Sequence, residues 1–359
     1  PPKNRVNSIA PLIRREIGMY KNLLKKATTN QELSEEEIFG LINAINRDEV
    51  SDLQIAGFQV ALLMKGSSLK EITSLAKAMR ANCIPLRPRL QEELMDTCGT
   101  GGGLSTFNIS TATAIVAASA GIPVAKHGSR SISSLSGSAD VLEALGVNIN
   151  LTPAQAEKMI EEIGIAFLYA PLFHPVMGKV LPAESDLGIK TIFYTIIGPL
   201  INPAFATRHL LGVYKPELLD TVAQVARDLG YTRAMFVHGE DGLDEISLIG
   251  ATRINELKDG VITTCTIEPE DFGLERCTLE EIKSGTPEEN ARTIRGVFSG
   301  EITGPKRNVI MLNAAGALIV GGKAADFAEG LARAGQLIDS GATAEKLQQL
   351  SALSHSFAG

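Results

Sequence analysis

The chain has 359 residues, more than one ordinary hydrophobic core accommodates, and this length predicts two domains. Apolar residues make up 44% and charged residues 21%, the balance of a globular protein, while a net charge of −7 disfavours a general nucleic-acid binder. No apolar run reaches the roughly 18 residues of a membrane span, and the first residues lack the order of a signal peptide. The four cysteines show neither paired nor metal-ligating spacing, so we expect reduced thiols in a cytoplasmic protein.

The first part of the chain predicts helices only. Three segments begin with a serine that is followed three residues later by Glu or Gln, at Ser34–Glu37, Ser51–Gln54 and Ser68–Glu71. This pattern satisfies free N–H groups at a helix start. Apolar residues then recur every three or four positions, and a further helix is expected from Glu16 to Lys26. We therefore predict a small all-helical domain over residues 1–84.

From residue 91 onward, short apolar runs alternate with longer helical stretches. The strand candidates cover 93–98, 122–128, 165–170, 208–214, 234–239 and 246–250. Such alternation predicts an α/β domain over 91–359, with a mainly parallel central sheet and helices on both faces. Ligands of such sheets bind at the carboxyl ends of the strands. The segment 172–197 interrupts the alternation, and we expect it to pack against the N-terminal domain as hinge helices.

A glycine-rich stretch, DTCGTGGGLSTFNIST, occupies residues 96–111 between a strand candidate and a helix candidate. Glycines at 99, 101, 102 and 103 can bring backbone N–H groups around phosphate oxygens, and the following helix N-terminus favours negative charge. Ser110 and Thr111 add hydroxyl donors at the same place. The stretch matches neither a P-loop nor a dinucleotide fingerprint. It predicts a phosphate site, with a plain turn as the alternative.

A second polar loop, AKHGSRSISSLSGSAD, covers residues 125–140 and also lies between a strand and a helix candidate. Lys126 and Arg130 in this loop can neutralise phosphate charge, Arg in bidentate fashion. The alternative is a solvated, serine-rich loop.

A third loop, HGEDGLDEISLIG, covers residues 238–250 and carries the carboxylates of Asp241, Asp244 and Glu245. Mg²⁺ is typically held by one or two carboxylates together with substrate phosphates. A surface acidic turn is the alternative, but two neighbouring phosphate loops favour a metal site. The three loops together predict a Mg²⁺-dependent enzyme that acts on a highly phosphorylated small molecule by positioning and charge stabilisation.

With these loops, and with SGSADVLEALG and GPLINPA, the chain resembles the anthranilate phosphoribosyltransferase family over nearly its whole length. The resemblance implies a nucleoside phosphorylase/phosphoribosyltransferase-like fold and a homodimer formed through the N-terminal helices. It also implies transfer of 5-phosphoribose from 5-phosphoribosyl diphosphate (PRPP) to an aromatic amine, with Mg²⁺ and release of pyrophosphate. Anthranilate, in tryptophan biosynthesis, is the default acceptor.

The resemblance further implies site residues, carried over position by position. Those that would bind PRPP are Asp96, Gly99, Thr100, Gly101, Gly102, Thr106, Asn108, Ser110, Thr111, Lys126 and Ser138. Those that would bind the acceptor are His127, Ser129, His174 and Glu184. Those that would hold the metal are Ser110, Asp244 and Glu245.

Several positions depart from the family pattern. The usual GTGGDGxxT is GTGGGLST here, one residue shorter and without the aspartate, and KTIFYTIIGPL is one residue longer than the usual RTIFNLLGPL. Ser129 replaces an asparagine, and Glu184 stands where an arginine usually meets the anthranilate carboxylate. Because Glu184 reverses that charge, two interpretations follow. Either Glu184 points to solvent and Lys179 or Lys190 takes its role, or the acceptor is not anthranilate.

Two other functional classes share features with this chain. A nucleoside phosphorylase would use phosphate as co-substrate and is expected to have a loop closer to STGG than to GTGG. A non-catalytic relative that binds nucleic acid is disfavoured by the net charge of −7 and by the carboxylates of LDEIS.

Overall fold

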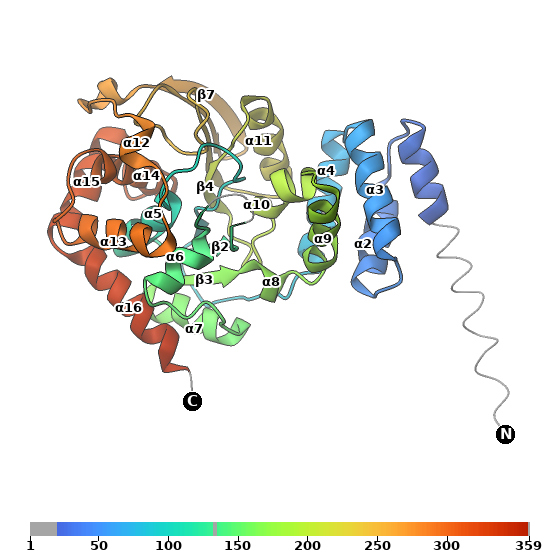
Figure 1. Cartoon of the computed structure of the whole chain (residues 1–359), viewed down its shortest axis with the longest axis horizontal. Coiled ribbons are helices and arrows are strands. Elements are labelled where there is room, and N and C mark those ends of the chain that lie inside the picture. The colour runs from blue at the N-terminus through green and yellow to red at the C-terminus, as the bar shows by residue number, and fades with distance from the viewer. Residues whose placement is uncertain (1–19, 132–134, 358–359) are drawn as a thin grey trace. The chain divides into compact units, whose positions relative to one another are not determined.

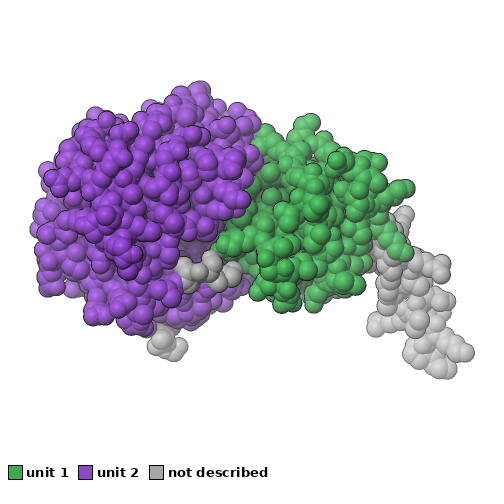
Figure 2. All heavy atoms as spheres, turned by 45° about the horizontal axis from the view of Figure 1, so that its top comes forward, with its two compact units in different colours: residues 1–83, 174–201 green, residues 84–173, 202–359 purple. Residues whose placement is uncertain are grey.

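The computed structural model describes residues 20–131 and 135–357, which form two compact units (Figures 1 and 2). Unit 1 comprises the chain up to Cys83 together with His174–Ile201. Unit 2 comprises Ile84–Phe173 and the chain from Asn202 onward. The helix expected over Glu16–Lys26 is helical over residues 20–28, and its first four residues lie outside the described part.

Unit 1 is built from helices alone. Its elements are α2 (Glu35–Asn46), α3 (Asp52–Lys65), α4 (Leu69–Ala81), α9 (Met177–Leu187), the π-helical η1 (Phe193–Ile197) and α10 (Gly198–Leu200). All three predicted capping boxes are confirmed, because each serine accepts a hydrogen bond from the backbone three residues on and the Glu or Gln there reaches back. Helix α3 packs against α9, and α2 packs against α4.

The π-helical turn η1 lies where the chain is one residue longer than the family pattern. A π-turn closes its hydrogen bond over one more residue than an α-helical turn does. Four of its five residues are buried: Phe193, Thr195, Ile196 and Ile197. The segment with the extra residue therefore lies in the interior of unit 1.

Unit 2 contains a seven-stranded sheet in the order β3-β2-β1-β4-β5-β6-β7. The strands are β1 (Met95–Asp96), β2 (Val124–Gly128), β3 (Ile165–Tyr169), β4 (Arg208–Gly212), β5 (Arg233–Gly239), β6 (Thr252–Lys258) and β7 (Val261–Ile267). The five strands from β3 to β5 are mutually parallel, and β6 and β7 are antiparallel. The predicted two-part fold with a mainly parallel sheet is confirmed.

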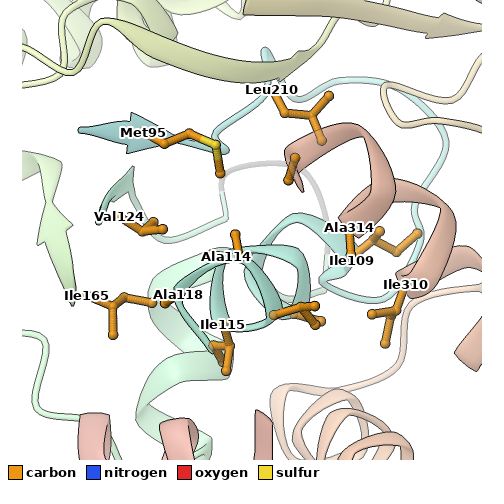
Figure 3. Packing of buried hydrophobic residues seen from close by; sticks show 14 of the residues in the cluster. Met95, Ile109, Ala114, Ile115, Ala118, Val124, Ile165, Leu210, Ile310 and Ala314 are labelled. Carbon is orange, nitrogen blue, oxygen red and sulfur yellow. The ribbon is translucent and has the colours of Figure 1, made fainter. Parts of the chain in front are cut away.

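Helices surround this sheet and complete the core of unit 2. They are α5 (Ile109–Ser119), α6 (Ser138–Ala144), α7 (Pro153–Ile163), α8 (Ala170–Phe173), η2 (Pro216–Leu218), α11 (Leu219–Asp228), η3 (Pro269–Phe272), α12 (Leu279–Ile282), α13 (Pro287–Phe298), α14 (Pro305–Val320), α15 (Phe327–Asp339) and α16 (Ala342–Ser356). Small residues such as Ala114 and Ala314 let α5 and α14 pack closely, and Figure 3 shows their side chains gathered with Met95 and Leu210. No helix within the described residues has the length and apolar character needed to cross a membrane.

The strand predicted over 246–250 is wrong. This segment is irregular, although Ile246 and Leu248 are fully buried. The side chain of Asn313 takes the place of a neighbouring strand, since it accepts a hydrogen bond from the Ile246 N–H (2.8 Å) and donates one to the Ile246 carbonyl (2.9 Å). Burial of an apolar run therefore does not by itself require a strand here.

The β6–β7 hairpin was not predicted, although the sequence carries a signal for it. Asp259 and Gly260 join the two strands with positive φ values of 50° and 80°. An Asp-Gly pair of this kind forms the two-residue turn that matches the twist of a hairpin.

Candidate functional site

The order of the parallel strands reverses at β1, because β2 and β3 lie on one side of it and β4 and β5 on the other. Such a switch point leaves a crevice outside the carboxyl ends of the strands, where ligands of α/β sheets bind. The glycine loop (residues 97–107) follows β1, and the acidic loop (residues 240–251) follows β5. The serine-rich loop follows β2, which is parallel to β1, so all three predicted loops begin at the edge where β4 ends.

Asp96 ends β1 and organises the start of the glycine loop. Its Oδ1 accepts hydrogen bonds from the backbone N–H groups of Thr97 (2.7 Å), Cys98 (3.1 Å) and His127 (3.1 Å). Its Oδ2 accepts one from the Asn202 amide at 2.7 Å. These four bonds join the ends of β1 and β2, so the carboxylate of this predicted PRPP residue supports the loop from beneath.

His209 anchors the same loop from β4. Its Nε2 lies 2.8 Å from the Cys98 carbonyl oxygen and 3.6 Å from the Cys98 thiol. Side-chain atoms of Asp96, Cys98 and His209 lie within 4.8 Å of one another, and all three residues are buried. Burial alone would raise the pKa of the Asp96 carboxyl, but basic neighbours, His209 foremost, hold it below its usual value. The cluster is held by hydrogen bonds to the backbone and fixes the path of the glycine loop.

The glycine loop is tied to the end of β4. The Thr100 N–H donates to the Gly212 carbonyl (2.9 Å), and Thr100 Oγ1 accepts from the Tyr214 N–H (3.0 Å). Gly101 and Gly102 have φ values of 62° and 94°, a region that favours glycine. Near the end of the loop, Thr106 forms an isolated bridge with Lys283.

The polar residues at the start of α5 divide into two groups. Asn108 is occupied by protein partners, because its amide donates to the Ser136 carbonyl (3.1 Å) and its oxygen accepts from Asn290 (3.0 Å). Thr111 is 1% exposed, and among residues 20–131 and 135–357 its hydroxyl has no hydrogen-bond partner. The Thr111 hydroxyl therefore faces the interior of unit 2 rather than the crevice.

Lys126 on β2 supplies a buried positive charge beside the glycine loop. The residue is 3% exposed, and its Nζ lies 3.5 Å from both Thr97 Oγ1 and Ser110 Oγ. The carboxylates of Asp96 and Glu245 interact electrostatically with this buried ammonium, and its two hydrogen-bond contacts are long ones to hydroxyl groups. The arrangement suits a bound phosphate.

The acidic loop places two carboxylates near the same position. Glu245 accepts a hydrogen bond from the Ser110 backbone N–H at the start of α5. Burial, with the neighbouring Asp244 charge, raises the pKa of Glu245 to about 8. Asp241 serves its own loop instead, accepting hydrogen bonds from the Leu243 N–H (3.0 Å) and the Ser247 hydroxyl. The two adjacent carboxylates repel each other, and a bound cation would relieve this repulsion. The pair therefore fits Mg²⁺.

The serine-rich loop between β2 and α6 is held by its own residues. Arg130 forms ion pairs with Asp140 (2.9 Å) and Glu143 (2.6 Å), so its guanidinium is engaged by protein carboxylates rather than directed at a phosphate. The predicted residue Ser138 donates from its hydroxyl to the Ser129 carbonyl at 3.3 Å. The loop contributes the exposed Ser129 to the surface.

The predicted acceptor residues belong to different units: His127 and Ser129 to unit 2, His174 and Glu184 to unit 1. His127 and His174 are both buried. Burial lowers the pKa of His127 to about 4, so its imidazole is neutral at neutral pH.

Glu184 does not point to solvent, and that interpretation is wrong. The residue is 4% exposed, and its Oε1 accepts hydrogen bonds from the Thr191 hydroxyl and from the Gln59 amide (3.3 Å). Burial raises the pKa of its carboxyl. Glu184 therefore joins α9, α3 and the segment before η1 within unit 1.

The two lysines considered as substitutes for the family arginine differ. Lys179 donates to the carbonyl oxygens of Ile45 and Asn46 at 2.9 Å and pairs with Asp48 at 2.6 Å, so it caps the end of α2. Lys190 lies over the Tyr194 ring, 5.0 Å from its centroid. Of the two, Lys190 retains the capacity to meet an acceptor carboxylate.

Sequence reasoning assigned no role to Asn202, His209 or Gly212. Asn202 and His209 bond Asp96 and Cys98 from positions more than a hundred residues away along the chain. A Cβ atom on Gly212 would lie 1.6 Å from the Asp244 carbonyl oxygen. The only signal in the sequence was a polar residue or a glycine within or beside an apolar run. Such a signal does not indicate which residue the side chain or backbone contacts.

Comparisons with known proteins identify the family that the chain is similar to. Residues 91–344 match the glycosyl transferase family, a/b domain, and residues 21–83 match its helical bundle domain. An anthranilate phosphoribosyltransferase of Desulfosudis oleivorans is 47% identical over 333 residues, which cover 92% of this chain and 98% of that protein.

Solved structures are similar over the same extent. The anthranilate phosphoribosyltransferase of Thermus thermophilus gives a TM-score of 0.86 at 41% identity, covering 93% of this chain and 99% of that one. The Saccharomyces cerevisiae enzyme, in complex with PRPP and Mg, gives a TM-score of 0.86 at 29% identity, covering 96% and 99%.

Proposed function

The chain belongs to the anthranilate phosphoribosyltransferase family of glycosyl transferases, and from this premise we propose that it transfers 5-phosphoribose from PRPP to anthranilate. The C1–oxygen bond to pyrophosphate breaks, a bond from C1 to the amine nitrogen forms, and the amine loses one proton. The observation that carries the proposal is the glycine loop at the β1/β4 switch point, with Lys126 on one side and Asp244 and Glu245 on the other.

Each part of this site has a distinct task in the transfer. The glycine backbone and the N-terminus of α5 would bind phosphate oxygens, and Lys126 would neutralise part of their charge. Asp244 and Glu245 would hold Mg²⁺, which offsets the charge of the departing pyrophosphate when bound. Anthranilate is a weakly basic amine that needs little deprotonation, so orientation beside C1 supplies much of the rate.

Pyrophosphate release in the presence of PRPP, Mg²⁺ and a panel of aromatic amines tests the function. Anthranilate is expected to give the highest kcat/KM, because relatives with this name cover nearly the whole chain and Glu184 is occupied inside unit 1. Efficient turnover of an amine without a carboxylate, with none of anthranilate, would assign a different acceptor. Phosphate-dependent cleavage of nucleosides instead would favour the phosphorylase alternative.

We also propose a homodimer formed through α3. Four apolar side chains of this helix are exposed: Leu53 (83%), Val60 (39%), Leu63 (46%) and Met64 (81%). Leu53, Val60 and Met64 are spaced seven and four residues apart, so they lie on one face of the helix. A face of this kind on a globular protein is typical of a protein–protein contact.

Charged substitutions on α3 test the dimer. The double variant Leu53→Lys/Met64→Lys is expected to halve the mass measured by light scattering, because two lysines cannot be buried unpaired in an apolar interface. Val261→Lys, at an exposed apolar position (62%) on β7 of unit 2, is the matched control and should leave the mass unchanged. A double variant with the wild-type mass would place the contact elsewhere.

The state of the cysteines supports a proposed cytoplasmic location. Within the described residues, Cys83, Cys98, Cys265 and Cys277 form no disulfide bond, as expected in a reducing compartment.

A further inference from the structure

We propose that Gly103 is a positioning residue for the Asp244 carboxylate, and that the altered glycine loop thereby helps to set the affinity for Mg²⁺ and PRPP. The inference rests on the proposed function and concerns the loop that lacks the aspartate of the family pattern. It assigns to Gly103 a role that acts through the side chain of a proposed metal ligand.

The first observation is the space around Gly103. A Cβ atom built on this residue would lie 2.8 Å from Asp244 Oδ1, 2.9 Å from the Gly242 carbonyl oxygen and 3.2 Å from the Asp244 backbone nitrogen. Distances below 3.0 Å are not tolerated between such atoms, and two of the three belong to the backbone, which cannot swing aside. Gly103 does not have a positive φ, so space rather than backbone conformation requires glycine here.

The second observation is that Asp244 has little room to retreat. A Cβ atom on Gly99 would lie 3.5 Å from Asp244 Oδ2, and one on Gly212 would lie 1.6 Å from the Asp244 carbonyl oxygen. The Asp244 main chain thus runs against β4, and its carboxylate lies between two glycines of the loop. A side chain at position 103 would displace the carboxylate rather than be absorbed by the loop.

Charge gives the same result for an acidic side chain at position 103. An aspartate at position 103 would bring a second carboxylate against Asp244, in addition to Glu245 beside it. Like charges this close raise the cost of ionising each of them. Glycine at position 103 therefore keeps a third acid away from Asp244 and Glu245, the two proposed metal ligands.

Calorimetric titration of PRPP in the presence of Mg²⁺ tests the inference with Gly103→Ala. The expected result is binding weaker by about 10-fold, as is typical when a group that orients a metal ligand is altered. Gly178→Ala in α9 is the matched control, since a Cβ atom there has no neighbour within 4 Å, and it should bind as the wild type does. Unchanged affinity of Gly103→Ala would overturn the inference while leaving the proposed function intact.

A double-mutant cycle with Asp244→Ala separates positioning from a general loop defect. If Gly103 acts through Asp244, Gly103→Ala should cause no further loss of affinity once the Asp244 carboxylate is absent; an additive loss would overturn the inference. The contacts of a Cβ atom at position 103 with the Gly242 carbonyl oxygen and the Asp244 backbone nitrogen persist in the double variant, so the affinities are compared on protein shown by thermal unfolding to be folded. Absence of PRPP binding by the wild type would overturn the proposed function and this inference together.

Discussion

Loss of Mg²⁺-dependent PRPP binding is the expected result of replacing Asp244 with Asn and Glu245 with Gln in one protein. Both changes keep the side-chain shape and remove the negative charge, and Gln can still accept from the Ser110 backbone N–H. Two neutral amides are poor ligands for a hard dication. We expect affinity to fall by at least about 100-fold, or about 2.7 kcal/mol, as measured by calorimetry.

Glu240→Gln is the control for this prediction. Glu240 lies in the same acidic loop but forms an exposed ion pair with Arg253 (3.2 Å), so its neutralisation should leave PRPP affinity within about twofold of the wild type. Equal loss in the control would point to the general charge of the loop. Unchanged affinity in the double variant would show that the metal is held by other residues.

The second large effect is expected from Glu184→Arg, which restores the family residue. Arg at this position would bury a cation where the chain provides the Thr191 hydroxyl and the Gln59 amide as donors. Neither group carries a negative charge, so the buried cation would have no opposite charge beside it, a situation that costs about 3–5 kcal/mol. The variant is expected to unfold at lower urea concentration than the wild type.

Glu184→Gln is the matched control for that result, because its carbonyl still accepts from Thr191 and its neutral head suits a site that raises the carboxyl pKa. It should lose no more than about 1 kcal/mol. A stable Glu184→Arg protein with a lowered KM for anthranilate would contradict the structural role and show that position 184 faces the acceptor.

The helices of unit 1 and the loops of the site were predictable because their signals are local. A serine with Glu or Gln three residues later caps a helix through groups close together in the chain, and all three such signals are confirmed. The glycine and acidic loops could be placed together because parallel strands present their carboxyl ends at one edge. The shared edge also predicts that Gly103 and Asp244 lie near each other. It does not predict how closely the two residues approach.

Contacts between residues far apart in the chain were not predictable, because the type of a residue does not indicate which residue it contacts. Arg130 pairs with two acids of the following helix, so its guanidinium is not directed at a phosphate. Asn313 satisfies the main chain of an apolar run that periodicity marked as a strand. Glu184 is a clear departure in sequence, yet only the positions of Thr191 and Gln59 reveal that its carboxyl is used inside unit 1.

The most direct test of the account is titration of PRPP into the wild-type protein, with Mg²⁺ and again with the metal removed by a chelator. Lys126, the glycine loop and the two carboxylates of the acidic loop form one site, in which Asp244 and Glu245 repel a diphosphate unless a cation lies between them. The account predicts tight binding with Mg²⁺ and binding weaker by at least about 100-fold without it. Equal affinity under both conditions would contradict it.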